Sequence, residues 1–252
     1  MSGIEVAVRT KRFPDPDGKG MREILGGLRF AAGEGEFLAI LGPSGCGKTT
    51  LLNLIAGLDP AYEGSVRFST ASGRASPVIG YVFQSPRLLP WRTARENVTL
   101  ALERPEAKAD LIDSLLEDAG LTAFQDAYPE KLSLGQCRRA AIVRAFAVEP
   151  DLLLMDEPFV SLDAPTAGRL RRLLLEIWGA RPTAVLFVTH DTDEAIALAD
   201  RVLVLSGSPA AVLADVAITA PRSERADPTV LATFRNLLLE ARNAGSEGGE
   251  RA

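Results

Sequence analysis

The residues best suited to chemistry begin with the glycine-rich stretch GPSGCGKTT at positions 42–50. Gly42, Gly47, Lys48 and Thr49 fit the pattern of a glycine, four residues and then Gly-Lys-Ser/Thr, which is typical of phosphate-binding loops. Glycines let backbone N–H groups curl around phosphate oxygens, and a helix that begins near Lys48 directs its positive dipole end at the anion. Lys48 can then reach the β- and γ-phosphates of a nucleotide, and the Thr49 hydroxyl can bind Mg²⁺.

The segments on either side of this loop predict how it is held. Residues 38–41 form a short apolar run of strand type, and residues 50–58 have the composition of a buried helix. A chance glycine-rich turn is the alternative interpretation, and the strand and helix argue against it.

A phosphate-binding loop needs an acidic partner, and DLLLMDEP at 151–158 predicts one. Residues 152–155 are continuously apolar, as expected for a buried parallel strand, and ligands bind at the carboxyl edge of such sheets. Asp156 at that edge would hold Mg²⁺ through water, and Glu157 would polarise the water that attacks the γ-phosphate. The alternative is a strand followed by a solvated acidic turn.

A second helix N-terminus suited to anions follows Ser133 in LSLGQ, residues 132–136. Ser133 is a good N-cap, and Pro150 ends the helix expected over about 134–148. One nucleotide does not need two such cradles from one chain. The second cradle therefore indicates a neighbouring subunit whose nucleotide it completes.

His190 is the only histidine of the chain. It follows the apolar run AVLFV at 184–188 and precedes three acids within four residues. Taken alone, such a histidine is more often structural than functional.

The order and spacing of these motifs resemble those of the nucleotide-binding subunits of ATP-binding cassette (ABC) transporters, over roughly residues 4–215. GPSGCGKTT is similar to their Walker A motif, DLLLMDEP to Walker B, and LSLGQ to their signature, usually Leu-Ser-Gly-Gly-Gln. SLD at 161–163 is similar to their D-loop, Gln84 to their Q-loop glutamine, and His190 to their switch histidine, which contacts the γ-phosphate.

Carried over residue by residue, the resemblance implies an ATPase that binds ATP and Mg²⁺. Catalytic roles are implied for Lys48, Gln84, Glu157 and His190, and Mg²⁺ ligation for Thr49, Gln84 and Asp156. ATP contacts are implied for Phe13, Gly42, Pro43, Ser44, Gly45, Cys46, Gly47, Lys48, Thr49, Thr50, Gln84, Ser133, Gly135, Gln136, Asp156 and Asp163.

Two of these assignments carry an alternative. Phe13 matches the family's adenine-stacking aromatic; a packed edge-strand residue is the alternative, because the insertion PDPDGKG that follows it blurs the alignment. Leu134 stands where the signature normally has a glycine. Ser133 and Gly135, which would touch the partner's ATP, are retained, so we interpret Leu134 as a tolerated variant that slows turnover; a dead site is the alternative.

The fold class that the resemblance implies is α/β, a P-loop NTPase core with a mostly parallel sheet. A small antiparallel β-subdomain would come from IEVAVRT, EILGGLRFAA and GSVRFS, and a helical subdomain from an insertion at about 87–148. We expect a single domain over 1–240 and a disordered tail at 241–252, because NAGSEGGERA is polar and glycine-rich.

Composition limits the function further. The net charge of −5 argues against nucleic-acid binding, which usually needs a basic surface. No apolar stretch approaches the ~18–20 residues that span a bilayer, and the N-terminus has no apolar signal core. We therefore expect the chain to stay in the cytosol, and the resemblance implies a peripheral position at the cytoplasmic face of the inner membrane.

The segment FQSPRLLPWRTARENV resembles importers for nitrate, sulfonates and taurine. The resemblance implies an ATP-hydrolysing motor subunit that works as a head-to-tail homodimer on two permease subunits and, indirectly, with a solute-binding protein. A soluble cassette regulator with low turnover is the first alternative. A P-loop small-molecule kinase is the second, and it leaves LSLGQ, SLD and His190 without a role.

Two side chains carry separate expectations. Cys46 at a helix N-terminus predicts a reactive thiol, unless the loop shields it. Trp91 in RLLPW predicts an exposed apolar patch for a permease, with ordinary packing as the alternative.

Overall fold

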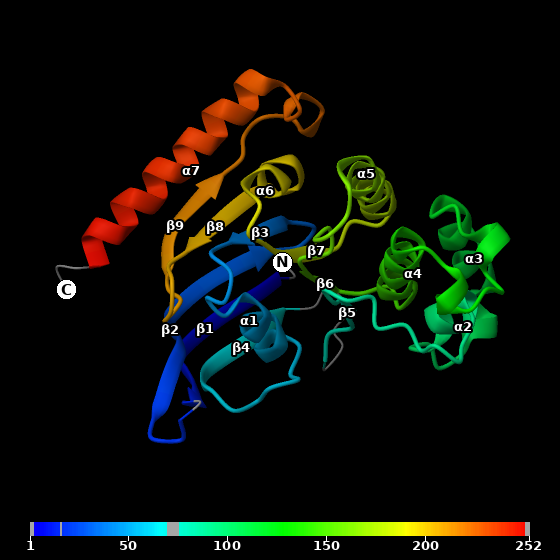
Figure 1. Ribbon diagram of the computed structural model, residues 1–252, viewed down its shortest axis with the longest axis horizontal. Coiled ribbons are helices and arrows are strands. Elements are labelled where there is room, and N and C mark those ends of the chain that lie inside the picture. The colour runs from blue at the N-terminus through cyan, green and yellow to red at the C-terminus, as the bar shows by residue number, and fades with distance from the viewer. Residues whose placement is uncertain (1–2, 16, 70–75, 250–252) are drawn as a thin grey trace. The chain divides into compact units, whose positions relative to one another are not determined.

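The computed structural model describes residues 3–15, 17–69 and 76–249, with side chains described as far as residue 244. It consists of two compact units. The first combines Met1–Arg74 with Ala184–Ala252, and the second is Ala75–Thr183. Figure 1 shows the elements of both.

The first unit begins with a small antiparallel sheet in the order β2-β1-β4. Its strands are β1 (Gly3–Pro14), β2 (Met21–Gly33) and β4 (Glu63–Ser69). Along β1, Ile4, Val6 and Val8 are buried while the residues between them are more exposed. This alternation is the reason that the segment forms a one-sided strand, and it confirms the antiparallel sheet predicted for these residues.

The same unit contains four strands of the larger sheet, in the order β7-β3-β8-β9. They are β3 (Phe37–Leu41), β7 (Ala184–Thr189), β8 (Arg201–Leu205) and β9 (Val212–Ala217). β3 pairs in parallel with both β7 and β8, and only β9 is antiparallel. Phe37 and Phe187 pack edge to face with ring centroids 6.2 Å apart.

Three α-helices complete the first unit: α1 (Lys48–Ile55), α6 (Thr192–Leu198) and α7 (Pro228–Gly249), with a short 3₁₀ turn at Arg222–Glu224. Helix α7 lies along β9 (Figure 1). Phe234 and Leu238 on its inner face are buried, as the helical spacing of apolar residues predicts.

The second unit contains β5 (Ile79–Val82) and β6 (Leu152–Asp156), which pair in parallel. Its α-helices are α2 (Ala94–Thr99), α3 (Ala109–Asp118), α4 (Leu134–Ala147) and α5 (Ala164–Ala180), and its 3₁₀ turns are Pro105–Lys108, Thr122–Phe124 and Pro129–Lys131. Helix α4 packs closely on β5, since a Cβ added at Gly80 would lie 2.4 Å from the Ala145 carbonyl oxygen. The α/β class with mostly parallel strand pairing is thereby confirmed.

The C-terminal segment differs from the expected disorder. Helix α7 continues through residue 249, so residues 241–249 are helical, whereas residues 250–252 lie outside the described part. The reason is local: Leu, Glu, Ala and Arg before residue 243 are strong helix formers, and the helix propagates from them. Within the described residues, no helix is both long and apolar enough to cross a membrane.

Candidate nucleotide site

The phosphate loop lies where β3 ends, at the carboxyl edge of the sheet. Leu41 of β3 is paired with Thr189 of β7, and the Gly42 N–H faces the Thr189 carbonyl at 3.4 Å. Because parallel strands end at one edge, the residues that follow the two strands, Gly42 and His190, are brought together although they are far apart in sequence.

Two glycines give the loop its curvature. Gly45 and Gly47 have φ of 77° and 108°, conformations that side chains disfavour. Gly47 is the N-cap of α1, so no side chain competes for the first N–H groups of the helix. These groups and the helix dipole favour an anion at this point.

Lys48 is buried at 5% exposure, and its Nζ donates to the carbonyl oxygens of Gly42 (2.9 Å) and Pro43 (3.0 Å). The cation therefore lies beneath its own loop instead of extending into solvent. Pro43, Ser44, Gly45 and Thr49 are exposed along the loop and the first turn of α1, and Thr50 is half-buried. The loop is therefore an exposed turn with the Lys48 ammonium bound to its carbonyl oxygens.

His190 is exposed at the end of the fully buried strand β7. A pocket of about 480 Å³ extends from it along the loop and beneath α7, and its lining includes Gly42, Pro43, Leu205 and Arg242. The position of His190 beside the phosphate loop agrees with the role implied for the switch histidine.

The three acids after His190 have structural partners. Asp191 caps α6 by accepting from the N–H groups of Asp193 and Glu194 at 2.8 and 3.2 Å. Glu194 accepts from the Thr189 hydroxyl at 2.8 Å, and Asp193 pairs with Arg235 of α7. They fix the turn that presents His190.

In the second unit, Asp156 and Glu157 lie at the carboxyl end of β6. Asp156 is buried at 4% exposure, and Glu157 is half-buried with φ of 43°. A positive φ at a non-glycine residue costs about 1–2 kcal/mol, so the surrounding loop must hold Glu157 in place. The N–H of Val160 bonds the Glu157 carbonyl at 3.2 Å and helps to do so.

Gln84 is exposed two residues beyond β5, at the same edge of the β5–β6 pair as Asp156. Burial, together with the charge of Asp156, raises the pKa of Tyr81 above its usual value. Carboxylate and amide oxygens such as those of Asp156 and Gln84 are the hard donors that Mg²⁺ prefers, so the donors that this unit supplies fit that ion.

The signature residues form the first turn of α4. The Ser133 hydroxyl accepts from the Gln136 N–H at 3.2 Å, and the Gln136 side chain accepts from the Ser133 N–H at 2.8 Å, which makes a capping box. Leu134 is 48% exposed. A Cβ added at Gly135 would lie 3.1 Å from Thr166 Cγ2 of α5, so this position favours glycine.

Asp163 caps the next helix. Its carboxylate accepts from the Thr166 N–H of α5 at 3.3 Å, and the hydrogen bonds with Thr166 lower the pKa of Asp163. This side chain is exposed at the end of the SLD segment.

Exposure bears on the expectations for three side chains. Cys46 is buried at 2% exposure, which favours the shielded alternative, and the reactive thiol predicted from its helix position stays a prediction. Trp91 is 68% exposed, so the packed alternative does not apply to it. Phe13 is 39% exposed near the end of β1, and Lys11 Nζ lies 4.4 Å from its ring centroid.

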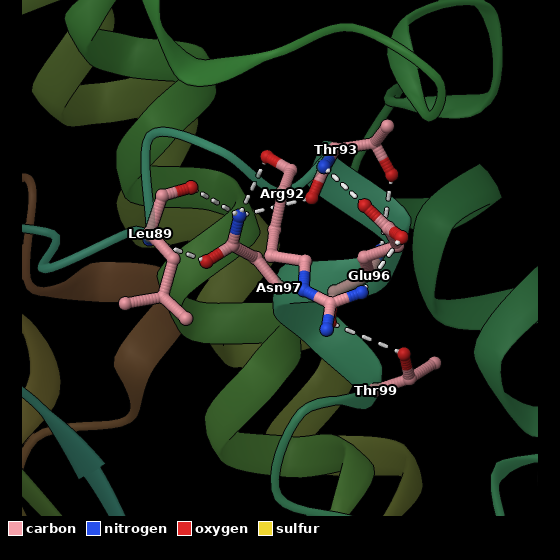
Figure 2. A network of polar contacts seen from close by, with 6 residues as sticks. All are labelled: Leu89, Arg92, Thr93, Glu96, Asn97 and Thr99. Atoms are coloured by element: carbon pink, nitrogen blue, oxygen red, sulfur yellow. Dashed lines mark hydrogen bonds and ion pairs between the residues drawn. The ribbon is translucent and has the colours of Figure 1, made fainter.

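Sequence reasoning missed three polar side chains of the second unit that hold its loops. Arg138 of α4 donates to the carbonyl oxygens of Pro158 and Val160, immediately after Glu157. Arg144 of the same helix binds the backbone of the loop after Gln84. Asn97 of α2 binds the same loop further along (Figure 2). The available signal in sequence was a polar residue on the inward face of a helix, which indicates a buried hydrogen bond. The sequence does not indicate which backbone groups these side chains bind.

The structure therefore brings the predicted residues together in two groups. The first unit assembles the phosphate loop and His190, and the second assembles Gln84, Asp156 and Glu157 at one strand edge, with Ser133 and Asp163 at helix starts. A glycine cradle that opens a helix and an acidic strand end define the class of P-loop nucleotide-binding proteins.

Comparison with known proteins defines the family. The ABC transporter family model matches residues 25–160. The aliphatic sulfonates import ATP-binding protein SsuB 2 of Burkholderia lata is 43% identical over 88% of this chain and 82% of its own length, and SsuB of Bacillus subtilis is 38% identical over 94% and 93%. The chain belongs to the ABC transporter family, as an ATP-binding protein with ATPase activity.

A solved structure supports the same conclusion. The ATP-binding cassette MJ0796, in a dimeric post-hydrolysis state bound to ADP and Pi, matches 86% of this chain and 100% of its own with a TM-score of 0.72 and 30% identity.

Proposed function

We propose that this chain is the ATP-hydrolysing motor subunit of a membrane importer for an aliphatic sulfonate or a related small anion. The observation that carries the proposal is the cradle of Gly45 and Gly47 with Lys48 buried beneath it, in a chain 38–44% identical to sulfonate-import ATP-binding proteins. The subunit would lie at the cytoplasmic face of the membrane, bound to permease subunits that work with a solute-binding protein.

Each group of residues would take one task in hydrolysis. The loop N–H groups and Lys48 bind the phosphates and neutralise their charge, while Thr49, Asp156 and Gln84 hold Mg²⁺, which would neutralise charge on the β- and γ-phosphates. Glu157 orients the attacking water and accepts its proton, and His190 donates to the γ-phosphate as its charge changes. The positive φ of Glu157 indicates a backbone that the surrounding loop constrains.

Pairing with a second copy would complete each site. Ser133, Leu134 and Asp163 are exposed at helix starts, a position suited to an anion carried by another chain. The similarity to a dimeric cassette supports the same pairing. A twofold arrangement then takes the phosphate loop from one chain and the signature from the other.

The role of Glu157 is tested by Glu157→Gln, which keeps the size of the side chain and removes the base. We expect ATP binding to persist, hydrolysis to fall by about 10²–10³-fold, and a dimer to accumulate with ATP. Hydrolysis near the wild-type rate would exclude the role. Glu149→Gln is the matched control, because Glu149 also has a positive φ but lies outside the site.

The pairing is tested by mixing two inactive variants, Lys48→Ala and Ser133→Arg. In their mixed dimer one site has both defects and the other has none, so activity should return when the two are combined. ATPase activity should also rise more steeply than linearly with protein concentration. Two results together would contradict sites shared between two chains. The first is a mixture of the two variants that forms dimers with ATP but recovers no activity, and the second is full wild-type activity in a monomer.

A further inference from the structure

The segment between Gln84 and Trp91 joins a site residue to an exposed side chain within the second unit. Gln84 follows β5, and Trp91, 68% exposed, lies seven residues later. Short loops of this kind are normally mobile unless side chains bind their backbone. Two helices supply such side chains here.

The half of the segment nearer Gln84 is held by aromatic stacking and by Arg144. The rings of Tyr81 and Phe83 stack with centroids 4.0 Å apart, and the Arg87 guanidinium lies 4.0 Å from the Phe83 ring centroid. Arg144 of α4 donates to the carbonyl oxygens of Pro86 (2.8 Å) and Arg87 (2.9 Å). Arg87 has φ of 45°, a conformation that needs such support.

The half nearer Trp91 is held by Asn97 of α2, which is fully buried (Figure 2). Its Oδ1 accepts from the Leu89 N–H at 2.7 Å. Its Nδ2 lies within hydrogen-bonding distance of the carbonyl oxygens of Leu89 (3.1 Å), Arg92 (3.0 Å) and Thr93 (2.9 Å), so one of its two N–H groups is shared between two of them. One amide therefore binds both backbone groups of Leu89 and the two residues after Trp91.

The N-terminus of α2, which carries Asn97, is itself fixed by a capping box. Thr93 caps α2, with its hydroxyl accepting from the Glu96 N–H at 3.2 Å while the Glu96 carboxylate accepts from the Thr93 N–H at 2.8 Å. The loop also bonds itself, since the Arg92 N–H donates to the Leu89 carbonyl at 3.1 Å. Trp91 thus projects from a backbone that is bound on both sides.

We propose that Asn97 is a positioning residue that makes residues 83–93 one rigid connection between Gln84 and Trp91. The proposal rests on the proposed function, in which Gln84 helps to hold the Mg²⁺ of the bound nucleotide. Because the buried amide binds the backbone on both sides of Trp91, a displacement of Gln84 is passed to Trp91 instead of being absorbed by the loop.

Trp91 can report on this connection directly. Trp178 is the only other tryptophan of the sequence, so Trp178→Phe leaves Trp91 as the sole indole. In that background, the anisotropy and emission of Trp91 are measured with and without MgATP, using Glu157→Gln to prevent turnover. We expect slow segmental motion and a nucleotide-dependent change in emission.

Asn97→Ala should then increase the segmental motion of Trp91 and remove most of its nucleotide-dependent change in emission. The affinity for MgATP should stay within about threefold, since Asn97 binds only loop backbone. Asn97→Asp keeps the acceptor for Leu89 but loses the donors to three carbonyl oxygens, and it should behave like Asn97→Ala.

Glu96→Ala is the matched control, because it breaks the cap of α2 but leaves the four contacts of Asn97. If it abolishes the Trp91 change as Asn97→Ala does, helix stability alone is responsible and the proposal is overturned. An unchanged nucleotide response in a folded Asn97→Ala variant, or a wild-type subunit that hydrolyses ATP without a Trp91 response, also overturns it. Failure to bind ATP at all would instead contradict the proposed function.

Discussion

Replacement of Gly47 by alanine tests the geometry of the phosphate loop most directly. Gly47 has φ of 108°, and a Cβ at this position would lie 2.7 Å from Ile24 Cγ2 and 2.9 Å from Leu25 Cδ2 of β2. Alanine in a left-handed conformation costs about 1–2 kcal/mol. Forcing an extra carbon against a packed strand costs about 1–3 kcal/mol more.

Together, the conformational cost and the steric cost predict that Gly47→Ala lowers the free energy of unfolding by about 2–5 kcal/mol. Urea denaturation followed by far-UV circular dichroism measures this loss. Nucleotide binding should fall as well, because relief of the clash must shift the loop that Lys48 and the first turn of α1 share, and small displacements at a binding site are costly. Calorimetric titration with MgATP measures that part.

Two other glycines separate the causes. Gly45 has φ of 77° and Gly57 has φ of 71°, and nothing lies within 4 Å of a Cβ at either. Gly45→Ala and Gly57→Ala should therefore lose only the conformational term, about 1–2 kcal/mol, and Gly57→Ala should bind nucleotide normally because it lies at the far end of α1. If Gly47→Ala is no less stable than Gly45→Ala, the steric argument is refuted.

Two further predictions concern buried groups of the first unit. The hydrogen bond from buried Lys11 (2.7 Å) lowers the pKa of Asp59, so this pair stabilises the fold above the unfolded carboxyl pKa of about 3.9, and the contribution is lost as pH falls through the lower folded pKa. Asp59→Asn should therefore flatten the dependence of the unfolding free energy on pH below about 4. Urea denaturation at a series of acidic pH values measures this, and the same pH dependence in the variant as in the wild type would contradict the pairing. Buried Cys46 should react with a thiol reagent only at the rate of loop opening, and labelling as fast as that of an unfolded control would show that the loop does not shield it.

Much of the site could be predicted from sequence because its chemistry depends on local patterns. The apolar run at 38–41, the glycines and Lys48 specify a strand, a left-handed turn and a helix start within one short segment. The same holds for Ser133 and Gln136, whose capping box is formed between residues three apart. Such interactions are set by backbone geometry, so residue type and spacing are sufficient to indicate them.

The tertiary structure decided what depends on partners distant in the chain. Sequence placed Asp193 among three acids near His190, but its pairing with Arg235 exists only because α6 and α7 pack together. Trp91 and Cys46 were each compatible with burial or exposure, and packing exposed the first and covered the second. Burial is a property of the whole core, which a local pattern does not contain.

Asn97 shows the same division most clearly. In sequence it is one asparagine in a six-residue helix, at the end of the importer-like stretch FQSPRLLPWRTARENV, with no role indicated by its residue type. In the structure it is fully buried and binds the backbone at residues 89, 92 and 93, because α2 packs against α4 and removes water from that side of the loop. The sequence determines that a side-chain amide with donors and an acceptor is present. Only the tertiary structure determines which backbone groups form hydrogen bonds with it, because an amide needs protein partners only when burial removes it from water.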